Sequence, residues 1–195
     1  MTKLRYFLFM LLILLSACSQ YPRINDTQQQ FPQAIPSHWT MTAKLGIRTA
    51  NNSGSATLNW QQQQDRYQIR LSGPLGQGAG KISGDNTYIT IERANKPPLF
   101  STKPEQLIQE TFNWELPLQH LSYWVRGLPS PYSNQAEQDY ANTGTLLQLR
   151  QSGWTLHYDR YHSIGRWLMP GRIKAQKETI KLTLVIKRWR FPPHL

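Results

Sequence analysis

Residues Tyr67–Ile82, with the sequence YQIRLSGPLGQGAGKI, contain the pattern on which the fold of this chain depends. Tyr67, Ile69 and Leu71 alternate with polar residues, which is typical of a β-strand with one apolar and one polar face. The strand then breaks at a Ser-Gly-Pro-Leu-Gly turn that carries one large apolar side chain, Leu75. Because loops run over the protein surface, Leu75 either points outward, toward an external apolar partner, or folds back onto the core.

The same alternation recurs on both sides of this stretch. Met41, Ala43, Leu45 and Ile47 share one face of a predicted strand, and a turn follows at residues 51–54. Short connections of this kind favour antiparallel hairpins. Further strands are predicted at residues 56–60, 81–91 (one or two strands), 145–150, 153–159, 168–174 and 179–188. The pattern indicates a strongly curved antiparallel sheet of about ten strands.

The hydrophobic period changes between residues 102 and 127. Leu107 and Ile108 begin an apolar stripe with helical spacing, and a second helix is predicted over residues 117–126. Two amphipathic helices between strands must bury their stripes, and the open face of the sheet is the natural place. The sequence therefore predicts a mainly β fold, an open (incomplete) antiparallel β-barrel with a helical lid inserted between strands. The polar residues 131–142 are predicted to be a loop.

The N-terminus resembles a bacterial lipoprotein signal. Lys3 and Arg5 precede an apolar run, Tyr6–Leu15, that is too short to span a membrane. The run ends in Leu-Ser-Ala-Cys, which matches the lipobox, and Cys18 is the only cysteine of the chain. We therefore expect residues 1–17 to be a signal peptide and Cys18 to carry the lipid. Ser19 then stands where an aspartate is expected in lipoproteins kept at the inner membrane.

Residues 18–38 are predicted to form a tether that carries the lipid on Cys18. Prolines and a glutamine run are typical of such an extended segment. Residues 39–195 have the size of one domain with its own core. The formal net charge of +11 would suggest nucleic acid in a cytosolic protein, but an exported chain is expected to bind none. Anionic lipid headgroups or an acidic protein are the more suitable partners.

The sequence lacks the motifs of nucleotide binding, metal binding and serine hydrolysis. Residues 73–81 are rich in glycine but lack the spacing of a P-loop or of a dinucleotide-binding turn. The five histidines occur without an HExxH motif or paired cysteines, so no metal site is predicted. No GxSxG motif is present. We expect a binding protein without cofactor or metal, and not an enzyme.

The aromatic and aliphatic residues of the predicted inner face have two interpretations. They form an ordinary filled core, or they line a cavity in the barrel that holds a lipid chain. The candidates for such an acyl-chain cavity are Leu45, Ile47, Leu58, Trp60, Tyr67, Ile69, Leu71, Trp124, Trp154 and Tyr158.

Five segments together resemble the LolB family of outer-membrane lipoprotein receptors. They are LSAC (15–18), GSATLNWQQ (54–62), DRYQIRLSGPLGQGA (65–79), LSYWVRGLP (121–129) and WTLHY (154–158). The resemblance implies an open β-barrel with a helical lid and a hydrophobic cavity. It also implies a monomer in the outer membrane, facing the periplasm and anchored by its N-terminal lipid.

The resemblance further implies partners and a mechanism. The chain is expected to accept acylated lipoproteins from the periplasmic carrier LolA and to release them into outer-membrane phospholipids without nucleotide hydrolysis. Pro74, Leu75 and Gly76 match the membrane-insertion loop of the family. One departure is a shorter first helix, expected only around residues 27–31 because Pro32 and Pro36 follow. The alternative function, from the charge alone, is a structural or assembly lipoprotein that binds a protein through its basic surface.

Overall fold

The computed structural model describes residues 35–73, 79–112 and 117–192. These residues belong to one compact unit, Ala34–Leu195. The predicted signal peptide, the lipobox Cys18 and the short helix around residues 27–31 lie outside the described residues. The predicted loop residues Pro74, Leu75 and Gly76 do so as well.

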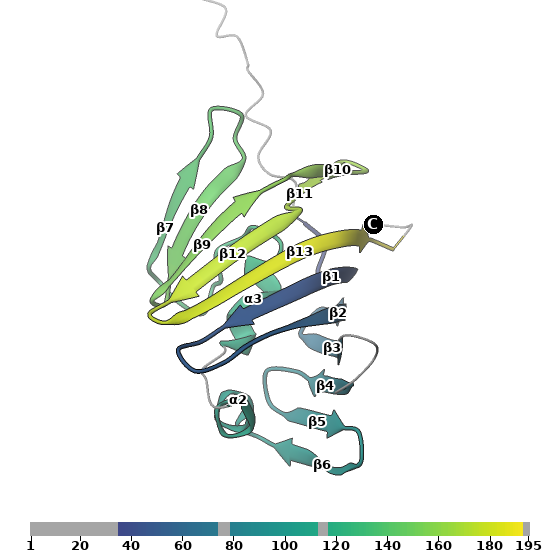
Figure 1. The fold of residues 1–195 in the computed structure, drawn as a ribbon. Coiled ribbons are helices and arrows are strands. Elements are labelled where there is room, and N and C mark those ends of the chain that lie inside the picture. The colour runs from purple at the N-terminus through teal and green to yellow at the C-terminus, as the bar shows by residue number, and fades with distance from the viewer. Residues whose placement is uncertain (1–34, 74–78, 113–116, 193–195) are drawn as a thin grey trace, which may run out of the picture. The chain divides into compact units, whose positions relative to one another are not determined.

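The described chain is built on one large antiparallel sheet (Figure 1). Its eleven strands lie in the order β6-β5-β4-β3-β2-β1-β13-β12-β9-β8-β7, and β10 and β11 form a separate small hairpin. The first six strands are β1 (His38–Arg48), β2 (Ser53–Gln63), β3 (Arg66–Ser72), β4 (Gly80–Gly84), β5 (Ile89–Arg93) and β6 (Lys96–Ser101). The others are β7 (Ala136–Tyr140), β8 (Leu146–Gln151), β9 (Trp154–Asp159), β10 (His162–Ile164), β11 (Trp167–Met169), β12 (Arg172–Lys177) and β13 (Ile180–Arg190).

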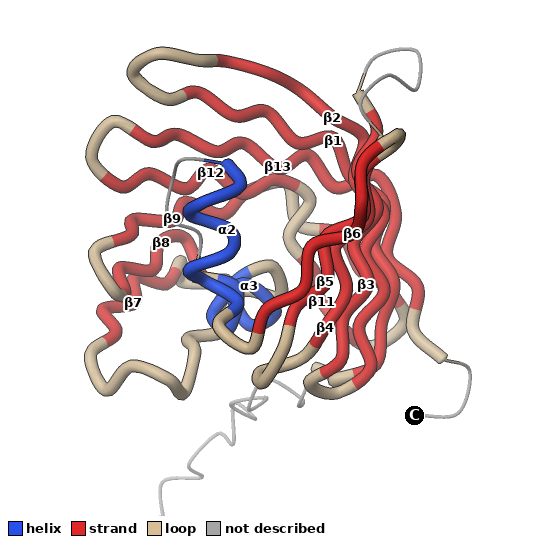
Figure 2. The backbone as a smooth tube through the Cα atoms, turned by 90° about the horizontal axis from the view of Figure 1, so that it is seen from below, coloured by secondary structure: helices blue, strands red, loops and turns tan. Residues whose placement is uncertain are grey.

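The path of the chain explains why the barrel stays open. The chain starts in the middle of the sheet at β1, moves outward to one edge at β6, and re-enters at the opposite edge, β7. Between the two edges it forms two helices, α2 (Pro104–Phe112) and α3 (Leu118–Trp124). The sheet curves around these helices, which lie on its concave side (Figure 2). The predicted open barrel with a helical insertion is confirmed, and the helices lie within the predicted range 102–127.

The inner face of the sheet is the apolar face that the alternation predicts. On β1, Trp39, Met41 and Ala43 are buried, while Leu45 and Ile47, on the same face, remain partly exposed. This difference along one strand shows where the filled core ends and where free space begins.

A β-bulge brings one further aromatic side chain into the core. Strict alternation from Ile180 to Ile186 would place Trp189 on the outer face of β13. The register of β1 against β13, however, shifts by one residue. Thr42 pairs with Arg188 and Ala43 pairs with Ile186. Lys187 is therefore left without a partner in the register. The extra residue returns Trp189 to the interior, where its ring lies 5.2 Å from the ring of Trp39.

Both edge strands escaped prediction. β6 contains Pro97 and Pro98, which are tolerated at an edge because an edge strand needs only half of its N–H donors. β7 occupies residues 136–140 of a predicted loop, so that prediction is wrong there. Its sequence, AEQDY, lacks apolar alternation because little of it is buried.

The strand predicted over residues 168–174 is in fact two strands, β11 and β12, separated by Pro170 and Gly171. A Cβ atom on Gly171 would lie 2.2 Å from the Arg160 carbonyl oxygen, so only glycine allows this close approach of two backbone segments.

A buried glutamine holds the helices to the sheet. Gln151, at the end of β8, accepts hydrogen bonds from the indole Nε1 of Trp124 and from the backbone N–H of Ser130, both at 2.8 Å. Its amide nitrogen donates to the carbonyl oxygens of Ser130 and Ser133. One side chain of the sheet thus satisfies polar groups of α3 and of the following loop.

Replacing Gln151 by leucine should lower the free energy of unfolding by about 3 kcal/mol, because the buried donors of Trp124 and Ser130 lose their partner. Urea denaturation followed by tryptophan fluorescence measures this loss. Gln176→Leu, at an exposed position of β12, is the control and should change stability by less than about 0.5 kcal/mol. Equal stability of the two variants would contradict the anchoring role of Gln151.

Candidate functional site

An apolar cavity of about 180 Å³ lies between the inner face of the sheet and the two helices. Every side chain that lines it is aliphatic or aromatic. The helices contribute Ile108, Phe112, Leu118, Leu121 and Trp124, together with Val125 just beyond α3. The sheet contributes Leu45, Ile47, Leu58, Trp60, Ile69, Leu71, Ile82, Trp154, Leu156, Ile173, Ala175, Leu182 and Leu184. A cavity with this lining favours an apolar ligand over water.

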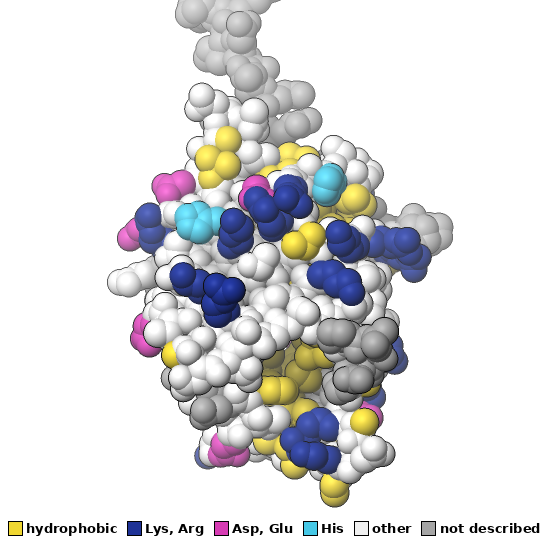
Figure 3. All heavy atoms as spheres, in the orientation of Figure 1, with side chains coloured by type: hydrophobic (Ala, Val, Ile, Leu, Met, Phe, Trp, Pro, Cys, Tyr) yellow, Lys and Arg dark blue, Asp and Glu magenta, His cyan; other side chains and the backbone are white. Residues whose placement is uncertain are grey.

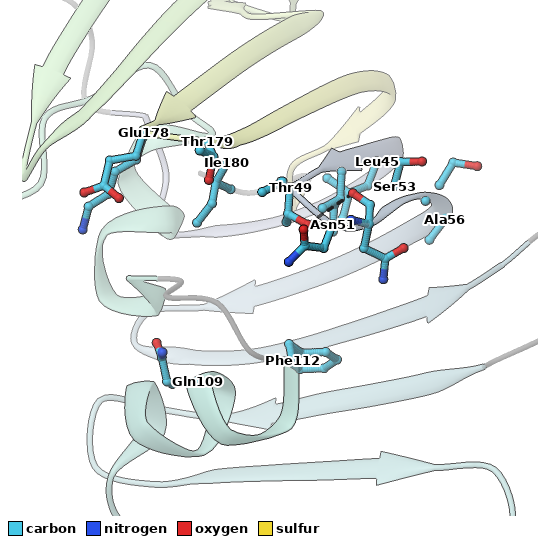
Figure 4. A pocket seen from close by; sticks show the side chains of 16 residues that line it. Leu45, Thr49, Asn51, Ser53, Ala56, Gln109, Phe112, Glu178, Thr179 and Ile180 are labelled. Atoms are coloured by element: carbon cyan, nitrogen blue, oxygen red, sulfur yellow. Dashed lines mark hydrogen bonds between the residues drawn. The ribbon is translucent and has the colours of Figure 1, made fainter.

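The cavity opens into a larger groove of about 840 Å³. Leu45, Ile47 and Phe112 line both spaces, so they form the passage between them. The groove lies between the C-terminal end of α2 and the β1–β2 and β12–β13 turns, and Figure 4 shows Phe112 and Gln109 facing these turns across it. Figure 3 shows apolar side chains at the bottom of a hollow on this face of the molecule.

A polar pocket of about 180 Å³ adjoins the cavity as well. Trp60, Ile69 and Leu118 line both. We call this polar pocket the rear pocket. Its charged lining residues are three carboxylates, Asp65, Asp85 and Glu105, and one cation, Arg126. Three tyrosines, Tyr67, Tyr123 and Tyr132, line it as well. The apolar cavity therefore has an open groove on one side and a polar, mainly acidic pocket on another.

Local contacts determine the titration of the rear pocket. Burial raises the pKa of the Glu105 carboxyl, whereas hydrogen bonds from the Thr87 side chain and backbone lower the pKa of Asp85. Arg126 donates from Nε to the Ser122 carbonyl oxygen at 2.7 Å and from Nη1 to the carbonyl oxygens of Ile35 and Pro36. This buried guanidinium ties the first described residues of the chain to the loop after α3.

Most of the predicted cavity residues do line the cavity, although their binding of acyl chains stays a prediction. These residues are Leu45, Ile47, Leu58, Trp60, Ile69, Leu71, Trp124 and Trp154. Tyr67 lies instead on the rear pocket. Tyr158 is packed in the core, where it is only 2% exposed and burial raises its pKa. Both tyrosines share the inner face of their strands with cavity residues, but they lie further along the strands.

The helical part of the lining was not among the predicted cavity residues, apart from Trp124. The signal was available, since Leu118 and Leu121 have the spacing of an apolar helical stripe. The sequence does not predict that the apolar stripe of this helix faces the cavity, because the orientation of α3 depends on its contacts with β8.

The last described residues before the predicted membrane-insertion loop lie beside this site. Leu71, at the end of β3, lines the cavity. Ser72 follows it and pairs with Thr57, the neighbour of the groove residue Ala56. The loop residues themselves lie outside the described part of the chain, so the position of Leu75 stays a prediction.

His120 is a buried titratable group next to Trp124, which lines the cavity. It lies on α3, is 5% exposed, and stacks on the ring of Trp124 at 5.1 Å with an interplanar angle of 11°. Its Nε2 lies 3.5 Å from the Ser152 hydroxyl, and its Nδ1 has no hydrogen-bond partner among the described residues. Burial lowers the pKa of this imidazole, so the folded protein favours its neutral form.

Among the described residues, no three His, Cys, Asp or Glu side chains come together in a way that could hold a metal ion. None of their helices is both long and apolar enough to span a bilayer.

The fold and the site define a mainly β protein, built as an open barrel around an apolar cavity with a helical cover. The model of the family "LolB: Outer membrane lipoprotein LolB" matches residues 37–189. A relative named outer-membrane lipoprotein LolB, from Cellvibrio japonicus, is 44% identical over 89% of this chain and 86% of its own. Another of the same name, from Pseudomonas fluorescens, is 38% identical over 95% and 96%. The chain belongs to the LolB family.

Membership in this family supports outer-membrane localisation and a role in lipoprotein localisation. Among solved structures, a DUF1329 family protein from Desulfovibrio piger has a similar fold, with a TM-score of 0.55 at 7% sequence identity. The similarity covers 83% of this chain and 88% of that one. At this identity it concerns the fold alone.

The lowered pKa of His120 predicts a loss of stability in mild acid. Below a pH of about 6.5 the unfolded chain binds a proton at this histidine that the folded chain resists binding. The free energy of unfolding should therefore fall as the pH drops from about 6.5 to about 5, by at most about 1.4 kcal/mol per pH unit from this group.

His120→Phe should reduce this slope while keeping a ring against Trp124. Urea denaturation at several pH values measures it, and His157→Phe, at an exposed position of β9, is the control for the removal of an exposed histidine. The same slope in wild type and His120→Phe would show that other groups cause the pH dependence.

Proposed function

We propose that the chain is an outer-membrane receptor that accepts acylated lipoproteins from the periplasmic carrier LolA and inserts them into the outer membrane. The observation that carries the proposal is the wholly apolar cavity with an open groove beside it, in a chain of the LolB family. Acyl chains are the part of a lipoprotein that such a lining suits, because they offer only apolar surface.

The volumes indicate how the cargo is held. A dry cavity of about 150 Å³ accommodates one benzene molecule, so the 180 Å³ cavity takes only a segment of an acyl chain. The groove has the size of a ligand pocket, about 300–1,000 Å³. We infer that the chains enter through the groove, past Phe112, and that α2 moves outward to admit them fully.

The site also bears on the direction of transfer. Each methylene moved from water into an apolar site contributes about 0.8 kcal/mol, so acyl chains never cross water freely. Without nucleotide hydrolysis, the direction follows from affinity alone: the receptor binds the chains more tightly than the carrier, and the bilayer more tightly still. A receptor with a small cavity suits an affinity between those of the carrier and the bilayer, because it binds the acyl chains but still releases them.

The N-terminal lipid is proposed to anchor the protein to the membrane. We propose that acylated Cys18 anchors the protein, as a monomer, to the periplasmic face of the outer membrane. Stable anchoring needs more than one acyl chain or a second membrane-binding element. The loop of Pro74, Leu75 and Gly76 then delivers the cavity rim to the bilayer.

Filling the cavity should block acceptance of cargo. Ala175 lines the cavity from β12, and Ala175→Phe places a ring in it. The affinity for a fluorescent fatty-acid analogue should fall about tenfold or more, because the chain loses its space. Fluorescence titration and transfer of a labelled lipoprotein from purified LolA measure the effect. Ala94→Phe, at an exposed position, is the control. Undiminished binding by Ala175→Phe would overturn the cavity as the acyl site.

Leu75→Glu should leave acceptance from LolA intact and slow release into liposomes, since a charged side chain does not enter the apolar part of a bilayer. Two transfer assays, with and without liposomes, separate the steps. Leu168→Glu changes an exposed leucine, 47% accessible, elsewhere on the surface and should release cargo like wild type. If Leu75→Glu releases at the wild-type rate, the loop has no part in insertion.

A further inference from the structure

The outer face of the central strands β1, β12 and β13 carries a group of cations, and these strands themselves carry no acidic residue. Figure 3 shows lysine and arginine side chains gathered over these strands. We define the basic face by its exposed residues Lys44, Arg48, Lys174, Lys181, Arg188 and Arg190. On the neighbouring strand β9 the carboxylate of Asp159 is engaged by Arg172, with Nε 2.7 Å from Oδ1.

The arrangement is unfavourable for the fold itself. Arg48 of β1 lies directly opposite Lys181 of β13, and like charges at such a position destabilise an antiparallel pair. Two cations elsewhere on the described strands do have a carboxylate partner on the next strand. Lys81 of β4 binds Glu92 of β5 at 2.7 Å, and Arg150 of β8 binds Glu137 of β7 at 3.2 Å. Among the described residues, no salt bridge of this kind offsets the repulsion between Arg48 and Lys181.

The shape of the basic face favours a broad partner. Its cations extend along β13 from Lys181 to Arg190, about 30 Å at the rise of a β-strand. They lie on the convex side of the sheet, and none of them lines the cavity, the groove or the rear pocket. A single small anion needs convergent donors in a recess, which a convex face does not offer.

The composition of the basic face favours lipid over protein. Protein interfaces depend on aromatic anchors and are depleted in lysine. The large exposed apolar side chains of the described residues, Tyr88, Phe100, Phe112, Tyr132, Tyr140, Leu147 and Leu168, all lie outside β1, β12 and β13. Between the cations stand Thr40, Thr42, Thr183, Gln176 and Val185. Separate cations on a polar ground match the headgroups of an anionic bilayer.

The basic face also meets the groove at one end. Arg48 is followed by the groove residue Thr49, and Lys181 is preceded by the groove residue Ile180. A bilayer bound to this face would lie beside the opening of the cavity. We propose that the basic face binds anionic phospholipid headgroups and places the groove at the membrane surface. This binding requires no cargo, so it stands or falls independently of the acyl-chain function.

The test uses residues 19–195, which lack the anchor cysteine but contain the whole compact unit Ala34–Leu195. Wild type should co-sediment with vesicles of phosphatidylcholine and phosphatidylglycerol, lose this binding at high salt, and ignore vesicles of phosphatidylcholine alone. The double variant Lys174→Gln/Lys181→Gln should bind the anionic vesicles about 25-fold more weakly, roughly fivefold per charge.

The matched control is Lys96→Gln/Lys103→Gln, which removes the same net charge from exposed lysines near the β6 edge. It should bind within about twofold of wild type if position matters more than net charge. Circular dichroism confirms that both variants fold. Equal losses in the two variants would overturn the proposal, as would binding that ignores phosphatidylglycerol. A basic-face variant that binds vesicles normally but accepts cargo poorly from LolA would assign the face to a protein partner and overturn the lipid proposal too.

Discussion

The inner face of the sheet presents more apolar surface than its own side chains and two short helices can cover. The eleven strands curve around α2 and α3, which have nine and seven residues, and the mismatch leaves the cavity between them. At about 24 cal/mol per Å³, an empty space of this size costs about 4 kcal/mol relative to a filled core. That is a large part of the 5–15 kcal/mol by which most domains are stable. A purely structural protein gains nothing from such a loss, whereas a protein that binds apolar chains recovers it when they enter.

The order of the strands makes this cavity possible. Because β1 and β13 pair in the middle of the sheet, the chain connecting its two edges must cross the open side. The crossing segment is the helical pair, which covers the cavity without closing the barrel. Its firm attachment, through Gln151 and Trp124, lies at α3. α2 contacts the β6 edge and turns Ile108 and Phe112 toward the cavity. The cover thus has a fixed part and a part held mainly by apolar contacts, which acyl chains can replace.

How far the sequence predicts this structure depends on the kind of information each feature needs. Alternation places the inward residues of β1, β2 and β3 correctly, because burial on one face imposes it. It fails at β6 and β7, whose edge positions relax that constraint. It also cannot anticipate the bulge at Lys187, which turns Trp189 inward, or tell Tyr158 in the core from Trp154 on the cavity. Those distinctions depend on how far along the strand the helices reach, and this is a property of the tertiary packing. Residues 73–79 show the opposite case, since their sequence is distinctive and the role proposed for them rests on family resemblance alone.

The proposed membrane contacts act over different distances, and this gives them an order. Charge on the basic face is felt over a Debye length of about 8–10 Å at physiological salt, whereas apolar side chains gain free energy only on contact with the hydrocarbon. In the proposed function, the tethered unit therefore first turns its cationic side toward an anionic bilayer and only then inserts an apolar loop. Since Arg48 and Lys181 adjoin the groove, the same rotation brings the passage at Leu45, Ile47 and Phe112 to the headgroups. The proposed acyl cargo would then have a short path from the cavity to the bilayer, with little exposure to water on the way.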